Sequence, residues 1–227
     1  MNEPGETVKE KTPFITYMLL SILFLVQLYL SLTAVDTSRE IYDTFSLVPA
    51  RLFQAVHVDS LVTYIFLHGN LLHLIVNGFA LYGAGVIVER DIGHLRYLLV
   101  FIVSGVVSGV THCYLNPASD IPLVGSSGAI FGLIAVLFLL MPFKVTYALI
   151  FPMPSVVVGL MLSLVELSAF WMANDVGVAH DVHLSGFVMG AIAAFTIDRR
   201  RALKGLFIAT VILAMMYYIG AHFNLLK

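Results

Sequence analysis

Seven stretches of apolar residues, each near the length of a membrane span, constrain this chain's fold more than any other feature. An α-helix needs about 20 apolar residues to cross the hydrocarbon core of a bilayer, with roughly 17 to 25 as the working range. We predict helices at Phe14–Ala34, Thr63–Val88, Tyr97–Leu115, Gly125–Met141, Met153–Met172, Ala179–Ile197 and Leu203–Gly220. Because helices satisfy their own backbone hydrogen bonds in lipid, we expect an all-α, polytopic membrane helical bundle.

The composition agrees with this expectation and excludes several kinds of protein. The chain is 59% hydrophobic and 11% charged, whereas soluble domains carry roughly a quarter of charged residues. Its net charge of -2 and the absence of a basic stripe argue against a nucleic-acid partner. With Cys113 as the single cysteine, an intramolecular disulfide and a cysteine-rich metal site are both excluded.

The sequence predicts one membrane domain in three parts. Residues 1–13 form a short N-terminal segment, residues 14–197 a six-helix core, and residues 198–227 a basic loop, a seventh helix and a short tail. The first apolar stretch is too long for a typical signal peptide and no A-x-A site follows it, so we predict a retained anchor.

Basic residues predict the orientation. With the N-terminus in the cytoplasm and seven alternating helices, nine of the twelve Lys and Arg residues face the cytoplasm, which the positive-inside rule favours. These nine are Lys9, Lys11, Arg90, Arg96, Lys144, Arg199, Arg200, Arg201 and Lys204. The C-terminus is then external, and we expect the plasma membrane as the location.

Polar residues inside the apolar stretches are candidates for function, because such groups are costly in lipid unless they are paired or face water. They are His68, His73 and Asn77 on the second stretch, Ser126 and Ser127 on the fourth, Glu166 on the fifth, and His180, Asp181 and His183 on the sixth. His73 and Asn77 are four residues apart and therefore share one helix face.

Small residues predict which helices touch. Gly128 and Gly132 form one small-xxx-small face on the fourth helix, and Gly186 and Gly190 form another on the sixth. Such faces let two membrane helices approach closely. Packing through them would bring a serine and a histidine together, which are the minimum for nucleophilic catalysis.

The fourth stretch is also short, at the lower limit for crossing a bilayer. A helix that starts late begins below the membrane surface, where its unpaired N–H groups and positive dipole end suit an oxyanion. His73 and Asn77 are candidates for further donors to the same charge.

Three motifs in this order resemble the rhomboid intramembrane serine proteases. Gly125-Ser126-Ser127-Gly128 is similar to their G-x-S-G, His183 to Gly190 to their H-x-x-G-x-x-x-G, and His73 to Asn77 to their H-x-x-x-N. The resemblance implies a rhomboid-like six-helix core with a Ser127 nucleophile, a His183 general base and an oxyanion hole lined by His73 and Asn77.

The resemblance also indicates which of the neighbouring serines and histidines are catalytic. Ser126 takes the variable place of G-x-S-G, and His180 lacks the correctly spaced glycines, so the catalytic unit is interpreted as a Ser127/His183 dyad. Phe131 provides a ring to pack under His183, and His68 is a further family feature. The implied substrates are transmembrane proteins cut near the outer membrane face, with no cofactor or metal.

Two other classes stay open. A proton or metal transporter would use a path through His68, His73, Glu166 and His180, and a non-catalytic relative would only bind membrane proteins. Glu166 has no family role, and we expect it to form hydrogen bonds within the bundle. Asp181 lies two residues from His183 and is expected to point elsewhere around the helix.

Overall fold

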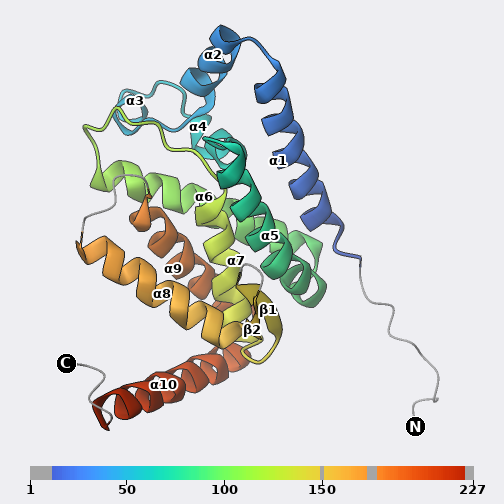
Figure 1. Cartoon of the computed structure of the whole chain (residues 1–227), viewed down its shortest axis with the longest axis vertical. Helices are drawn as coiled ribbons and strands as arrows, with labels where there is room; N and C mark the ends of the chain where they lie inside the picture. The colour runs from blue at the N-terminus through green and yellow to red at the C-terminus, as the bar shows by residue number, and fades with distance from the viewer. Residues whose placement is uncertain (1–11, 149–150, 173–177, 223–227) are drawn as a thin grey trace.

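The computed structural model describes residues 12–148, 151–172 and 178–222, and over these residues the chain is a bundle of helices with one small β-hairpin (Figure 1). The N-terminal segment with Lys9 and Lys11, and the tail that ends at Lys227, lie outside the described residues. Their predicted cytoplasmic and external placements therefore stay predictions.

Within the described residues, six helices are long and apolar enough to cross a membrane. They are α1 (Phe14–Leu32), α5 (Leu71–Ile92), α6 (His94–Leu115), α8 (Ser155–Met172), α9 (His180–Ile197) and α10 (Arg199–His222). A seventh apolar helix, α7 (Ser127–Leu140), is shorter, with 14 residues. Each predicted stretch overlaps one of these helices, so the prediction of an all-α polytopic membrane bundle is confirmed.

The second predicted helix begins later than its hydropathy suggests. Residues from Thr63 form the end of α4 (Ser60–Thr63), the 3-10 helix η1 (Tyr64–Phe66) and an extended turn, and α5 begins at Leu71. The side chain of Asn70 accepts a hydrogen bond from the backbone N–H of His73 and so caps α5. The apolar run hid this break, because hydropathy does not distinguish a buried turn from a helix.

A β-hairpin precedes α8. Strands β1 (Val145–Ala148) and β2 (Phe151–Pro154) pair antiparallel, with Val145 opposite Pro154. The hydroxyl of Thr146 donates to the carbonyl of Gly83, which attaches the hairpin to α5.

The long connection after α1 holds α2 (Val35–Phe45), α3 (Pro49–Leu52) and α4, which gather at one end of the bundle, hereafter the loop end (Figure 1). Two backbone hydrogen bonds join Leu47 to Leu123, just before α7. The Tyr42 hydroxyl donates to the carbonyl of His68. These bonds fix the segments on either side of the site described below.

α7 lies in the middle of the bundle (Figure 1), and every residue of it except Ser127 is buried. It packs most extensively against α9. A Cβ atom at Gly186 would collide with the carbonyl of Gly128, and one at Gly190 with the carbonyl of Gly132. The predicted contact between the two glycine faces is confirmed, and it sets how closely α7 and α9 approach.

α10 runs across the opposite end of the bundle from α2 and α3, hereafter the α10 end (Figure 1). Gly205 packs on the backbone of Leu139, and Arg201 donates to the carbonyl of Leu140 and to the carboxylate of Asp91. Its outer half, including Tyr217 and Tyr218, is exposed. The helix predicted beyond the core is therefore present, but it lies across this end and does not run along the bundle toward the loop end (Figure 1). The external C-terminus thus stays a prediction that the arrangement of α10 does not support.

Candidate active site

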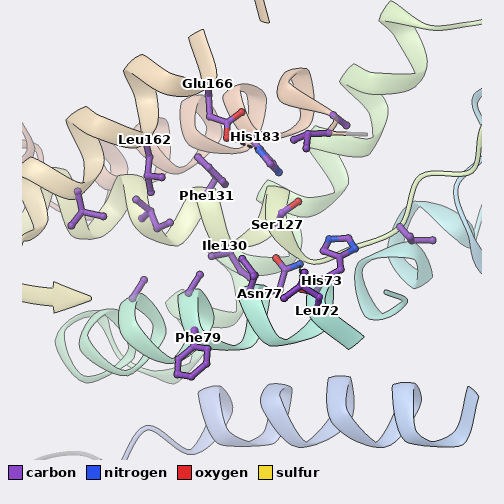
Figure 2. Close-up of a pocket in the computed structure, with 18 of the residues that line it drawn as sticks. Leu72, His73, Asn77, Phe79, Ser127, Ile130, Phe131, Leu162, Glu166 and His183 are labelled. Atoms are coloured by element: carbon purple, nitrogen blue, oxygen red, sulfur yellow. Dashed lines mark hydrogen bonds and ion pairs between the residues drawn. The ribbon is translucent and has the colours of Figure 1, made fainter. Parts of the chain in front are cut away.

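One cavity of about 1430 Å³ holds the residues that the sequence motifs single out. Its walls come mainly from α5, α7, α8, α9 and the hairpin, and the five polar residues named next lie toward the loop end. Ser127, His183, His73, Asn77 and Glu166 all line it, together with apolar side chains such as Phe131 and Leu162 (Figure 2). Four helices that are distant in sequence thus contribute to a single site.

The backbone before α7 brings Ser127 into this cavity. Gly125 has a φ of 123°, in the region that favours glycine, and its N–H donates to the carbonyl of Tyr64. A Cβ atom at Gly125 would lie 2.8 Å from Cε1 of His73. Glycine is required here both for its dihedral angle and for this close approach.

The two adjacent serines occupy different environments. Ser126 is fully buried, and its hydroxyl lies 3.4 Å from Nε2 of His68, away from the cavity. Ser127 is the first residue of α7, is only partly buried and lines the cavity. The side chain of Ser127 is therefore the one open to a substrate.

His183 lies in the first turn of α9 and shares the cavity with Ser127. In Figure 2 the Ser127 hydroxyl and the His183 ring point into the same space from α7 and α9. Phe131, one turn after Ser127, stacks on the imidazole, with ring centroids 4.4 Å apart and planes within 7°. The predicted packing of this ring under His183 is confirmed.

Glu166 is the site residue that the sequence left without a role. Its carboxylate faces two imidazoles of α9, with Oε1 2.9 Å from Nδ1 of His183 and Oε2 2.6 Å from Nδ1 of His180. The hydrogen bond with His180 confirms the expected bonding within the bundle, and the contact with His183 is an ion pair. The sequence identified neither partner. The only signals available were one acidic residue in an apolar stretch and a His-x-x-His spacing.

His180 and Asp181 are placed apart from the serine. His180 contacts Glu166 and does not line the cavity. Asp181 binds Nδ1 of His112 at 2.8 Å and Nδ2 of Asn116 at 3.3 Å, on α6 and just after it. The expectation that Asp181 points away from His183 is confirmed.

His73 and Asn77 lie in the first two turns of α5, on the face toward Ser127 (Figure 2). Asn77 is buried, and its amide donates to the carbonyl of His73 at 3.0 Å. Both residues line the cavity, so the remaining amide N–H of Asn77 and a ring N–H of His73 can donate hydrogen bonds to a bound group.

His68 packs against His73 and does not itself line the cavity. It is fully buried, and its ring meets that of His73 edge to face, with centroids 5.0 Å apart. Burial, and to a lesser extent the neighbouring His73, lowers the pKa of His68 to about 4. The ring is therefore neutral at ordinary pH, and it packs against His73 without adding charge.

Glu166, His180 and His183 also form a possible metal-binding group, because their ligand atoms lie within 4.8 Å of one another. One carboxylate and two imidazoles are a donor set that zinc accepts in proteins. The prediction that the site needs no metal or cofactor stays a prediction.

Comparison with known proteins places the whole site inside one family domain. The family model described as "Rhomboid domain" matches residues 55–200. The chain is 30% identical over 125 residues to rhomboid protease GluP of Bacillus subtilis, covering 55% of this chain and 24% of that protein. It is 36% identical over 84 residues to the putative rhomboid protease YdcA of Bacillus subtilis, covering 37% of this chain and 42% of that protein.

A third relative, rhomboid-like protease 5 of Toxoplasma gondii, is 33% identical over 135 residues, covering 59% of this chain and 16% of that protein. The matches thus span less than half the length of each of these relatives. The domain match itself covers more than half of this chain and includes every motif described above. The chain therefore belongs to the rhomboid family.

Proposed function

We propose that the chain is an intramembrane serine protease that cuts transmembrane proteins near the outer membrane face. The observation that carries the proposal is the placement of Ser127 and His183 in one cavity, at the point where α7 and α9 touch through their glycines. Two relatives from Bacillus subtilis with the same domain carry the name of rhomboid proteases, one of them putatively.

In this mechanism the Ser127 hydroxyl oxygen attacks the scissile carbonyl carbon while His183 takes its proton. His183 then protonates the leaving amine, and a water molecule that it activates releases the acyl-enzyme. The developing oxyanion is stabilised by N–H groups at the start of α7 and by His73 and Asn77.

The cavity supports a transmembrane substrate. It extends from His73 and Ser127 to Phe151 and Ser155, between α5 and α8, and much of its wall is apolar. A carbonyl in an intact helix is already hydrogen-bonded to an N–H group, so the segment to be cut must unwind locally. Gly or Pro near the cut site weakens a helix and should therefore raise the cleavage rate.

The site also sets a topology for the proposal. Water and the cut site must both reach the loop end, so we place this end on the external side and the N-terminus in the cytoplasm, in the plasma membrane. A cysteine at position 227 should react with an impermeant maleimide on intact cells in a Cys113→Ala background. Reaction only after permeabilisation would contradict the external C-terminus.

The direct test compares the two serines on one model transmembrane substrate reconstituted in liposomes. Ser127→Ala should abolish cleavage, whereas Ser126→Ala should retain it, because only Ser127 lines the cavity. Ser126→Ala is a matched control, since both variants lose one hydroxyl from the same turn. Cleavage by Ser127→Ala at the wild-type rate would contradict the proposal.

The cluster of Glu166, His180 and His183 favours one alternative, a metal-dependent activity or a metal path through the bundle. The protease proposal expects EDTA to leave turnover unchanged. Loss of cleavage in EDTA that added zinc restores, with Ser127 dispensable, would support the alternative. A non-catalytic membrane-protein binder would instead bind the substrate and leave it intact in all of these experiments.

A further inference from the structure

Glu166 is the buried acidic residue in the cavity that the serine–histidine mechanism does not use. Resting on the proposed function, we propose that Glu166 is a positioning residue for catalysis, which orients the His183 ring and holds the proton on its Nδ1. The working unit of this chain would then be Ser127, His183 and Glu166 rather than a serine–histidine dyad.

The position of Glu166 within α8 calls for such a role. α8 has no other charged residue, and the side chains of Val165 and Leu167 on either side of it are exposed on the bundle surface. Glu166 itself is turned inward and is only 8% exposed. A carboxylate within a membrane helix is costly and is retained where it has a partner, and here its partners are two imidazoles.

The contact fixes the functional tautomer of His183. Nδ1 of its ring lies 2.9 Å from a carboxylate oxygen of Glu166, close enough for an ion pair, although the N–H is not aligned for a hydrogen bond in this structure. A small rotation of the ring would align it, and an ionised carboxylate only accepts hydrogen bonds. The ring proton is therefore favoured on Nδ1, and the lone pair of Nε2 is left free to take the proton of the Ser127 hydroxyl. Once His183 is protonated, the same carboxylate stabilises the imidazolium ion.

The imidazole is held on two sides. Phe131 covers one face of the ring, and Glu166 meets its edge (Figure 2). The stacked phenyl ring restricts the plane of the imidazole but provides no hydrogen-bond acceptor, so Phe131 cannot select the tautomer. This selection requires the carboxylate.

His180 acts through Glu166. Its Nδ1 bonds the other carboxylate oxygen at 2.6 Å, which orients the carboxylate toward α9. Asp181, although adjacent in sequence, is engaged by His112 and does not contact His183. The two acidic residues near the site therefore differ in function, and Asp181 provides a matched control.

The test measures kcat and KM against pH for wild type, Glu166→Gln, Glu166→Asp and the control Asp181→Asn in liposomes. Replacing the acid of a serine-protease triad by its amide lowers kcat about 10⁴-fold. The carboxylate of Glu166 contacts the rings of both His180 and His183, so it interacts less exclusively with His183 than the acid of a triad does. We therefore expect a smaller loss, about 10- to 1000-fold in kcat for Glu166→Gln, with KM nearly unchanged. The acid limb of the kcat/KM profile should move to lower pH.

Glu166→Asp, which keeps the charge, should recover part of the rate, and Asp181→Asn should stay within about twofold of wild type. Wild-type kcat and an unmoved pH profile in Glu166→Gln would overturn the proposal. If Glu166→Gln does not fold, a wild-type rate and profile in folded Glu166→Met, which also lacks the charge, would overturn it equally. Loss of cleavage in Ser127→Ala would meanwhile still support the protease, so the two proposals fail separately.

Discussion

Two buried glutamates, one toward each end of the bundle, show how differently a membrane protein can use the same costly group. Glu89 lies near the α10 end and is fully buried. It accepts hydrogen bonds from the backbone N–H groups of Ile15 and Thr16 and from the Thr16 hydroxyl, and it contacts His94. The donors are the unpaired N–H groups at the start of α1, so this carboxylate joins two helices.

Glu166 lies toward the loop end, and no backbone N–H donates to it among the hydrogen bonds of the described residues. Its partners are two imidazoles, which can gain and lose protons, and one of them lines the cavity with Ser127. A carboxylate bound to fixed backbone donors stabilises the fold, whereas one bound to titratable rings can take part in chemistry. The predictions below test this difference, beginning with the largest expected effect.

The histidines that face the two glutamates should differ most. His183→Ala should lose cleavage by about 1000-fold or more, because it removes the general base. His94→Ala should keep the wild-type kcat, because His94 is half-exposed and does not line the cavity that holds Ser127. The test measures the cleavage rates of both variants on the same liposome substrate. Equal losses would contradict a catalytic role for His183 that His94 lacks.

The polar side chains on α5 should come next. The double variant His73→Ala/Asn77→Ala should lower kcat by about 100- to 1000-fold, the usual effect of removing one oxyanion donor. The single variants should lose less, because each remaining donor compensates in part. Thermal unfolding in detergent is the control, and a folded double variant with the wild-type rate would mean that both residues are only structural.

Glu89→Gln should act on stability rather than on rate. An amide replaces one oxygen acceptor by an NH₂ donor, which then faces an N–H group of α1 or the Thr16 hydroxyl. We expect the free energy of unfolding to fall by about 2–4 kcal/mol. Cleavage per folded molecule should stay within about twofold of wild type, and a large fall in kcat without loss of stability would contradict a structural role.

His68 should give the smallest effect, and it depends on pH. Its pKa is lowered by burial, with His73 second, from 6.5 to about 4. Between these values the unfolded chain binds a proton that the folded chain does not, so stability falls as pH falls through this window. We expect a loss of about 1 kcal/mol between pH 7.5 and pH 5.5.

Thermal unfolding of wild type and His68→Gln at these two pH values measures this effect. The other histidines titrate in both proteins, so the quantity of interest is the difference between the two pH dependences. Wild type should lose more stability than His68→Gln. Identical losses would mean that His68 is not held neutral by the fold.

The sequence predicted the helices and the α7–α9 contact, because each depends on spacing along one helix. The family resemblance implied the packing of Phe131 under His183, which lie on different helices. Apolar length predicts a span, and glycines four residues apart predict a close helix contact. Residues that share a helix face can thus be placed without coordinates.

The start of α5 and the partners of Glu166 were not predictable in this way. The turn before α5, residues 67–70, is short and lies between two apolar segments, so only its polar residues and the capping Asn70 marked the beginning of the helix. Glu166 and His183 lie on different helices, and no spacing rule relates them. Their contact depends on how α8 rotates against α9, which tertiary packing determines.

Covalent labelling is the sharpest test of whether Ser127 is the nucleophile. The reconstituted protein is treated with a fluorophosphonate, which reacts with activated serines, and the modified residue is located by peptide mass spectrometry. We predict one adduct, on Ser127, that disappears in His183→Ala and forms more slowly in Glu166→Gln. An adduct on Ser126, or none in a protein that cleaves its substrate, would contradict it.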